Sequence, residues 1–274
     1  MHPLGGPAIG CHCLLVEAEG GLVLVDTGFG SADMAHPRRR LSGLLRRLAG
    51  VRFDPIDTAV EQVKELGFKP KDVRHILLTH LDFDHAGGIA DFPGATVHVL
   101  AAEATAARRR GGFWSRRRYR PVQWRAAARW QEYRPDGEPW FGFDAARPLA
   151  GLPSDFMLIA LPGHSPGHAG VAIRTGATWL LHAGDALFDQ AELGAQQRTS
   201  ARPPLFERLL QSSGAVRRRT LARLRDLAAS ARGEVRIICA HDLALLQSCQ
   251  RDAERARRSG RARARLDEPA RGPP

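Results

Sequence analysis

The segment ILLTHLDFDHAGG (residues 76–88) places four potential metal ligands, His80, Asp82, Asp84 and His85, within six residues. Imidazole and carboxylate groups together are common ligands of zinc, iron and manganese, and close spacing on one loop lets several of them face one point. The segment by itself is also compatible with a solvated acidic turn that contains structural histidines. Further ligands elsewhere in the chain would favour the metal site.

Three later segments also present a His or Asp side chain at the end of an apolar run. They are LPGHSPGHAG (161–170) with His164, LLHAGDALF (180–188) with Asp185, and IICAHD (237–242) with His241. Binding sites of open α/β sheets usually lie at the carboxyl ends of the strands. Convergence of these ends on one edge predicts a site for two metal ions.

Short apolar segments, each β-branched or Leu-rich and bounded by Gly, Pro or Asp, predict buried strands. They are 21–28, 73–79, 95–100, 156–161, 169–175, 177–184 and 235–241. Helical spacing of Val60, Val63 and Leu66 predicts a helix over 57–67, and a second helical region is expected over 203–231. Interleaved strands and helices indicate an α/β domain.

The predicted domain spans residues 1–250 and contains an insert at 103–150. The insert holds four of the five tryptophans (Trp114, Trp124, Trp130 and Trp140), both tyrosines and two RRR triplets. The basic tail 251–274 starts as a possible helix end and then loses apolar periodicity, so it is expected to be disordered.

The net charge of +11 comes almost entirely from arginine, because the chain has only three lysines. An arginine-for-lysine skew with abundant Ala and Gly is what a GC-rich coding sequence produces, so the charge is a weak argument for a nucleic-acid partner. No apolar run reaches the roughly 20 residues that span a bilayer, and the first residues lack the pattern of a signal peptide. The four cysteines do not form a disulfide framework. We therefore expect a reduced, cytoplasmic protein, and the sequence does not indicate its oligomeric state.

These motifs resemble the metallo-β-lactamase superfamily, whose pattern is an early VDTG, then HxHxDH, a later His, a later Asp and a final His. The chain has LVDTG with Asp26, followed by HLDFDH and the three later ligands in the same order. The segments HLDFDHAGG and PGHSPGH most resemble the corresponding motifs of the N-acyl homoserine lactone lactonases of that superfamily. The resemblance implies an αββα sandwich with the metals at one edge of two sheets.

The resemblance also implies a role for each ligand. His80, Asp82 and His164 are expected to hold one divalent ion, Asp84, His85 and His241 the second, and Asp185 to bridge both. A hydroxide shared by the ions would attack the substrate, with Asp84 carrying a proton toward the leaving group. Asp26 is implied to orient ligands without binding metal.

Asp82 departs from the family pattern, which has histidine there. A histidine that binds through Nδ1 and an aspartate that binds through Oδ both place the ligand atom directly on Cγ, so we favour substitution over loss of the site. Zinc is implied by the resemblance, and the additional carboxylate tilts the site toward manganese or iron.

Other side chains are candidates for substrate contact or for structural roles. Tyr119 and Trp124 of the aromatic insert are expected to line the substrate pocket. Its arginines Arg116, Arg117, Arg118 and Arg120 are expected to meet an acidic substrate group. Phe188 stands where the lactonases carry a tyrosine that contacts the lactone. We expect structural roles for His168 and His182, and core packing for Cys11 and Cys13.

The sequence therefore predicts a metallo-hydrolase that acts on a small ester, lactone or thioester. A phosphodiesterase or nuclease of the same superfamily, and a non-catalytic sensor with a weakened first metal site, are the alternatives.

Overall fold

The computed structural model describes residues 10–49, 53–125, 127, 129–194 and 211–258, and its strands form two sheets. The first sheet has the order β1 (Leu14–Ala18), β2 (Gly21–Val25), β3 (Val73–Leu77), β4 (Thr96–Leu100) and β5 (Arg129–Tyr133). The second has the order β11 (Val235–Ile238), β10 (Thr178–His182), β9 (Ala169–Thr175), β8 (Phe156–Ala160), β7 (Phe143–Pro148) and β6 (Glu138–Trp140).

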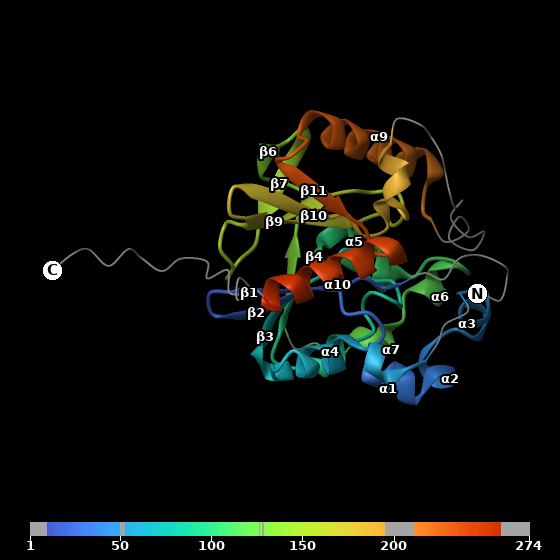
Figure 1. The fold of residues 1–274 in the computed structure, drawn as a ribbon. Helices are drawn as coiled ribbons and strands as arrows, with labels where there is room; N and C mark the ends of the chain where they lie inside the picture. The colour runs from blue at the N-terminus through green and yellow to red at the C-terminus, as the bar shows by residue number, and fades with distance from the viewer. Residues whose placement is uncertain (1–9, 50–52, 126, 128, 195–210, 259–274) are drawn as a thin grey trace.

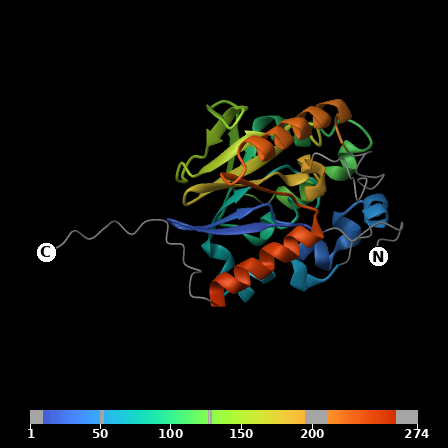
Figure 2. The ribbon, with the colours of Figure 1, turned by 45° about the horizontal axis from the view of Figure 1, so that its top comes forward.

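Helices flank the two sheets (Figures 1 and 2). They are α1 (Ser31–Ala35), α2 (Pro37–Arg40), α3 (Gly43–Ala49), α4 (Ala59–Glu65), α5 (Ala101–Arg109), α6 (Ser115–Arg118), α7 (Pro121–Trp124), α9 (Gly214–Ser230) and α10 (Leu243–Arg258). Figure 1 shows α9 above the second sheet and α4 below the first, and α10 crosses in front of the two sheets at mid-height in this view. In the described part of the chain, no helix combines the length and apolarity needed to cross a membrane.

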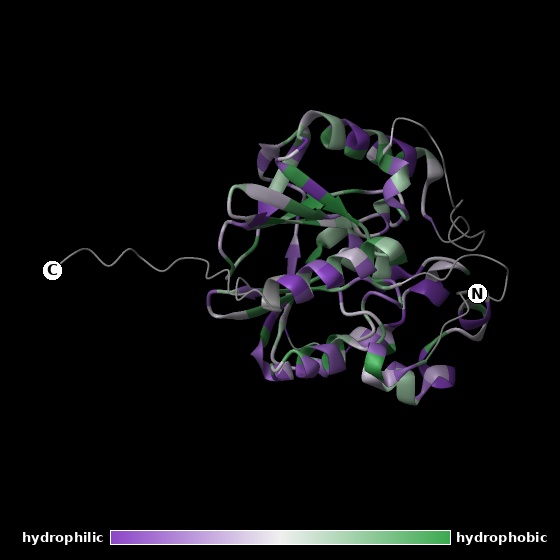
Figure 3. Cartoon of the chain, in the orientation of Figure 1, coloured by the Kyte–Doolittle hydropathy of each residue, from purple (hydrophilic) through white to green (hydrophobic). Residues whose placement is uncertain are grey.

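Alternating strand residues divide the apolar side chains among three cores. In β2, Leu22 and Leu24 belong to a buried cluster shared with α4, whereas Val23 and Val25 belong to the cluster between the sheets. Hydrophilic residues cover α4 where it faces away from the sheet (Figure 3).

The second sheet divides its residues in the same way. In β8, Met157 and Ile159 join Leu224 of α9 in a second outer cluster, while Phe156 and Leu158 face the inter-sheet cluster. Three apolar layers between four structural layers make an αββα sandwich, which confirms the predicted fold class.

All seven predicted strands are present, as β2, β3, β4, β8, β9, β10 and β11, and the predicted helix 57–67 is α4. The expected helix over 203–231 begins only at Gly214, and residues 203–210 lie outside the described residues. The expectation of an insert needs correction, because β5, β6 and β7 of segment 103–150 complete both sheets. The exposed side chains of β5 hide the strand pattern in the sequence.

Helix α10 continues past the predicted domain boundary at residue 250. Leu243 and Leu246 lie beside Gly10, and Leu245 packs against the outer cluster of the second sheet. Residues 251–255 are exposed along the helix. Residues 259–274 lie outside the described residues, so disorder of the tail stays a prediction there.

Truncation after Gln250 is expected to leave the melting temperature nearly unchanged, because residues 251–255 are exposed and the surface ion pair of Asp252 with Arg236 contributes little. Truncation after Asp242 also removes the leucines of α10 and is expected to cost at least about 2 kcal/mol, or roughly 4–8 °C in a domain of this size. Thermal denaturation of both truncated proteins measures the difference. Equal melting temperatures would show that α10 does not stabilise the domain.

Candidate metal centre

Strands of both sheets end at one edge and deliver the predicted residues there. Asp26 follows β2, His80 follows β3, His164 follows β8, Asp185 follows β10 and His241 follows β11. Strands β2 and β3 are parallel, as are β10 and β11, and β8 shares their direction because β8 and β10 are both antiparallel to β9. All five side chains are buried.

Asp26 holds the loop that carries the first ligands. Its Oδ1 accepts from the Thr79 backbone N–H at 2.8 Å, and its Oδ2 accepts from Thr79 Oγ1 at 2.8 Å and from His85 Nδ1 at 2.9 Å. Burial alone would raise the pKa of Asp26, but His85 holds it below its usual value. This geometry agrees with the orienting role implied for Asp26.

A contact of the same kind orients the rings of His241 and His80. His241 Nδ1 donates to the Gly10 carbonyl at 2.7 Å, and His80 Nδ1 lies 2.9 Å from Thr79 Oγ1. With Nδ1 engaged, Nε2 of each ring faces the centre. The Nε2 atoms of His80 and His85 are buried and have no hydrogen-bond partner among the described residues. This is expected for atoms that serve as metal ligands.

Asp185 lies at the centre of the four histidines. Its Oδ2 is 3.1 Å from His241 Nε2, 3.4 Å from His164 Nε2 and 3.8 Å from His80 Nε2. Its Oδ1 is 3.3 Å from His85 Nε2 and has no hydrogen-bond partner among the described residues. One carboxylate therefore faces both groups of ligands.

His80, Asp82 and His164 form the first group. Asp82 Oδ2 is 3.0 Å from His164 Nε2 and 3.3 Å from His80 Nε2. Tetrahedral ligand atoms with metal bonds of about 2.1 Å are spaced about 3.4 Å apart. The observed spacing, including the 3.4 Å from His164 to Asp185, fits an ion held by these side chains.

The second expected group is Asp84, His85 and His241, in which Asp84 lies near both histidines. Asp84 Oδ2 is 3.9 Å from His85 Nε2 and 3.8 Å from His241 Nε2. The Asp84 side chain is 14% exposed, against at most 3% for the other ligands of both groups, so it marks the accessible side of the centre. Cys11 also belongs here, with Sγ 3.9 Å from Asp84 Oδ2. The expectation of core packing is therefore wrong for Cys11, whereas Cys13 packs against the core.

The carboxylates of the centre raise the pKa values of the His85 and His241 rings and so favour positive charge on them. Burial alone would raise the pKa of Asp185, but the surrounding histidines, His241 foremost, hold it well below its usual range. Burial alone would lower the pKa of His241, yet Asp185 and Asp84 raise it to about 10. Protons on these rings occupy positions that divalent cations would take, so the donor set fits metal ions.

Arg118 does not face a substrate, contrary to the expectation for the arginines of segment 103–150. It is 3% exposed, and its Nε and Nη2 donate to Asp82 Oδ1 and Oδ2, both at 2.6 Å. Its Nη1 donates to the His164 carbonyl at 3.1 Å. Burial alone would raise the pKa of Asp82, but Arg118 and then His80 hold it well below its usual range. The buried Arg118 guanidinium therefore belongs to the centre itself. The ligand motif HLDFDH does not predict it.

The three predicted substrate residues lie in different places. Phe188 lies at the centre, with its ring stacked on His241 at 5.6 Å between centroids. Tyr119 is 2% exposed within the core, which leaves it no surface for a substrate, so that expectation is corrected.

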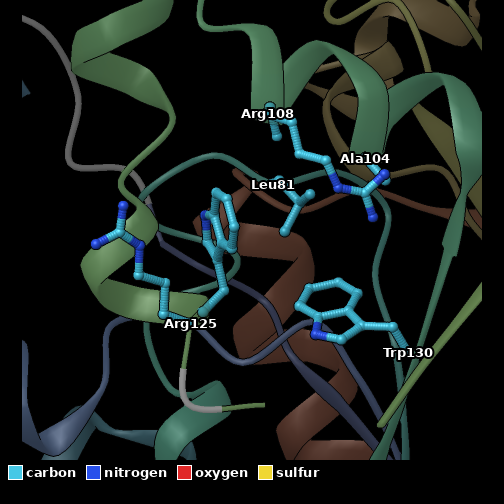
Figure 4. Close-up of a pocket in the computed structure, with 7 residues that line it drawn as sticks. Leu81, Ala104, Arg108, Arg125 and Trp130 are labelled. Carbon is cyan, nitrogen blue, oxygen red and sulfur yellow. The ribbon is translucent and has the colours of Figure 1, made fainter. Parts of the chain in front are cut away.

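Trp124 is also separate from the metal ligands. It lines a pocket of about 220 Å³ together with Leu81, Ala104, Ala107, Arg108, Arg125 and Trp130 (Figure 4). None of the seven proposed ligands lines this pocket, so the expected substrate contact of Trp124 is corrected as well. Residues 126 and 128 beside it lie outside the described residues.

The two other histidines near the ligands have structural partners, as expected. His168 Nδ1 donates to the Leu161 carbonyl at 3.1 Å, and its Nε2 accepts from the Asp185 backbone N–H at 3.0 Å. His182 Nε2 donates to the His12 carbonyl at 2.9 Å. Their rings support the ligand loops.

Glu103 is a buried carboxylate that no sequence motif indicates. It accepts hydrogen bonds from the Leu81 N–H at 3.0 Å, Ser165 Oγ at 2.6 Å and the Gly167 N–H at 3.1 Å. It thereby joins the loop of His80 and Asp82 to the loop of His164. A Glu within a helical segment carries no sequence signal of this role.

Glu103→Ala is expected to lower the free energy of unfolding by about 3 kcal/mol, because each buried donor left unpaired costs about 1–3 kcal/mol. Urea denaturation checks this result. Ser165→Ala, which removes one of the three bonds, should cost clearly less. Equal losses for both variants would contradict the joining role of Glu103.

Comparisons with known proteins found related sequences. The sequence profile of the Metallo-beta-lactamase superfamily matches residues 6–194. A probable metallo-hydrolase of Mycobacterium tuberculosis is 44% identical over 242 residues, covering 88% of this chain and 77% of that protein. An N-acyl homoserine lactonase of Bacillus cereus is 28% identical over 165 residues, covering 60% of this chain and 58% of that protein.

Solved structures show the same fold. An N-acyl homoserine lactone hydrolase with N-hexanoyl-L-homoserine at its catalytic metal centre has a TM-score of 0.65 at 23% identity, covering 88% of this chain and 84% of that chain. AidC, a dizinc quorum-quenching lactonase, has a TM-score of 0.58 at 18% identity, covering 86% of this chain and 73% of that chain.

Proposed function

This chain belongs to the metallo-β-lactamase superfamily and is a metal-dependent hydrolase. We propose that its centre holds two divalent ions and hydrolyses a small ester, lactone or thioester. His80, Asp82 and His164 hold the first ion, Asp84, His85 and His241 the second, and Asp185 both. The position of Asp185 between the two groups, with all four histidines within 3.1–3.8 Å of its carboxylate, is the observation that carries the proposal.

Bound ions of this kind lower the pKa of water and polarise a carbonyl oxygen. The residues of the chain supply the rest. Asp84 is the most exposed carboxylate of the centre, so it can carry a proton from the attacking water to the leaving group. The Phe188 ring, stacked on His241, forms an apolar wall beside the reacting carbonyl.

The proposed substrate class rests on the apolar character of Phe188. The lactonases among the relatives and neighbours act on N-acyl homoserine lactones, as their names say. Phe188 offers no hydroxyl to a lactone, so we propose the broader class of acyl compounds with an apolar group beside the ester bond. Zinc is favoured by the dizinc neighbour, and manganese or iron by the oxygen ligand Asp82.

The purified protein, loaded with zinc, manganese or iron, should hydrolyse members of a panel of p-nitrophenyl esters, lactones and thioesters. Activity should disappear with a chelator and return with the metal. Hydrolysis of only bis-p-nitrophenyl phosphate would replace the acyl substrate with a phosphodiester. Absence of bound metal after anaerobic purification with zinc would contradict the proposal as a whole.

The contact between Arg118 and Asp82 favours one second candidate, a non-catalytic sensor with a weakened first site. In that case a cation of the protein already neutralises Asp82. Such a protein would bind one ion per chain and hydrolyse nothing on the panel, so metal content measured beside activity separates the two candidates.

A further inference from the structure

Arg118 and Asp82 form a buried ion pair inside the ligand cluster, at a position where the family pattern has one neutral histidine. We propose that the two residues act as one neutral ligand unit, in which Asp82 Oδ2 binds the first ion and Arg118 is the positioning residue that fixes Asp82 and balances its charge. This inference rests on the proposed two-metal centre and goes beyond it by assigning Arg118.

The geometry fixes Asp82 on both oxygens. Arg118 Nε donates to Oδ1 and Nη2 donates to Oδ2, each at 2.6 Å. Two parallel hydrogen bonds from a planar guanidinium define the orientation of a carboxylate in a way that a lysine cannot. The third nitrogen, Nη1, donates to the His164 carbonyl at 3.1 Å, so one side chain positions two ligands of the first group.

Asp82 can serve Arg118 and a metal ion at the same time. Each carboxylate oxygen offers about two lone pairs, and Arg118 Nη2 uses one of those on Oδ2. Oδ2 also lies 3.0 Å from His164 Nε2 and 3.3 Å from His80 Nε2. These distances match the edges of a tetrahedral site, which are about 3.4 Å.

The charge of the centre explains why the cation is needed. With histidine at position 82, the carboxylates of Asp84 and Asp185 would give the ligands a charge of −2. Asp82 makes it −3, and Arg118 returns it to −2. Charges this close and this buried interact strongly, so the Asp82–Arg118 unit reproduces the electrostatics of the histidine that it replaces.

The location of Arg118 supports a built contact. Arg118 ends α6 (Ser115–Arg118), and the next residue, Tyr119, pairs with Asp82 as an isolated β-bridge. The guanidinium is therefore fixed from the backbone beside Asp82. The neighbouring Arg116 on the same helix is exposed, which makes it the matched control.

The test is a double-mutant cycle. It uses four variants beside the wild type: Asp82→His, Arg118→Leu, the double variant Asp82→His/Arg118→Leu, and the control Arg116→Leu. Each protein is stripped with a chelator and loaded with zinc. Zinc equivalents are measured by mass spectrometry, affinities by competition with a chromophoric chelator, and melting temperatures on the metal-free forms.

Wild type and Arg116→Leu should bind two zinc ions with equal affinities. Asp82→His alone leaves Arg118 buried without its carboxylate, so the first ion should bind about 100-fold more weakly and the metal-free protein should melt lower. Arg118→Leu, which leaves Asp82 buried without its cation, should also melt lower without metal. The double variant, with a neutral histidine and no cation, should regain both ions to within about tenfold of wild type.

The proposal would be overturned if Asp82→His bound two zinc ions as tightly as the wild type. It would also be overturned if the double variant bound the first zinc ion no more tightly than Asp82→His alone. A wild type with one ion, together with Arg118→Leu with two, would show instead that Arg118 blocks the first site. Should Asp82→His be insoluble, Asp82→Asn removes the same charge at the same shape. It should weaken the first ion about 100-fold, and an unchanged affinity would count against the unit.

The measurements do not require a substrate. If the cycle behaves as expected and no compound on the panel is hydrolysed, the acyl-hydrolase proposal fails and the Asp82–Arg118 unit stands. If the panel is active and the cycle shows no coupling, only the unit fails.

Discussion

Replacement of Asp185 by alanine is expected to reduce kcat/KM for any hydrolysed substrate by at least about a thousandfold. Metal ions supply several kcal/mol of transition-state stabilisation, and each 1.36 kcal/mol corresponds to about a tenfold change in rate. Asp185 faces all four histidines, so its loss weakens both ions at once. Metal content per chain should fall from two ions to fewer than one under the same loading.

Asp144→Ala provides the control for this substitution. Asp144 is an aspartate with a 92% exposed side chain that pairs with Arg223 on the surface at 3.1 Å. Its replacement should change neither metal content nor rate, because surface ion pairs contribute little. An Asp185→Ala protein that keeps two tightly bound ions would show that Asp185 is not the shared ligand.

Asp26→Ala is expected to have the largest effect on stability. Three donors, the Thr79 N–H, Thr79 Oγ1 and His85 Nδ1, would lose their buried acceptor, at about 1–3 kcal/mol each. Asp26 also has a φ of 54°, in the left-handed region where aspartate and asparagine are tolerated better than alanine. The melting temperature should fall by roughly 10 °C or more.

Asp26→Asn separates the two contributions. Asparagine keeps one acceptor oxygen and tolerates the positive φ, so it should lose clearly less stability than alanine. Its amide cannot replace both carboxylate oxygens, so orientation of His85 should suffer and the second ion should bind roughly 10- to 100-fold more weakly. Asp57→Ala, on the exposed surface, is the control. A loss for Asp26→Ala as small as for Asp57→Ala would contradict the role of Asp26.

The strand framework could be predicted because its signals are local. Each buried strand is a short apolar run with Gly, Pro or Asp at its ends, and each ligand lies in a loop that follows such a run in the sequence. The αββα fold class followed from the resemblance, and the structure confirms it. Segment 103–150 was misjudged as an insert because β5, β6 and β7 have exposed or irregular side-chain patterns, and only pairing with β4 and β8 makes them part of the sheets.

The candidate metal ligands and the strand ends that present them can be found in the sequence, because residue type and local periodicity are properties of short segments. The side chains around these ligands become visible only in the folded protein. Arg118 lies 36 positions from Asp82 in the sequence, Glu103 lies 62 from Ser165, and Cys11 lies 73 from Asp84. Contacts of that separation depend on how both sheets and their connecting loops pack together. For that reason the sequence showed an aspartate in place of a histidine, and the fold showed the arginine that balances its charge.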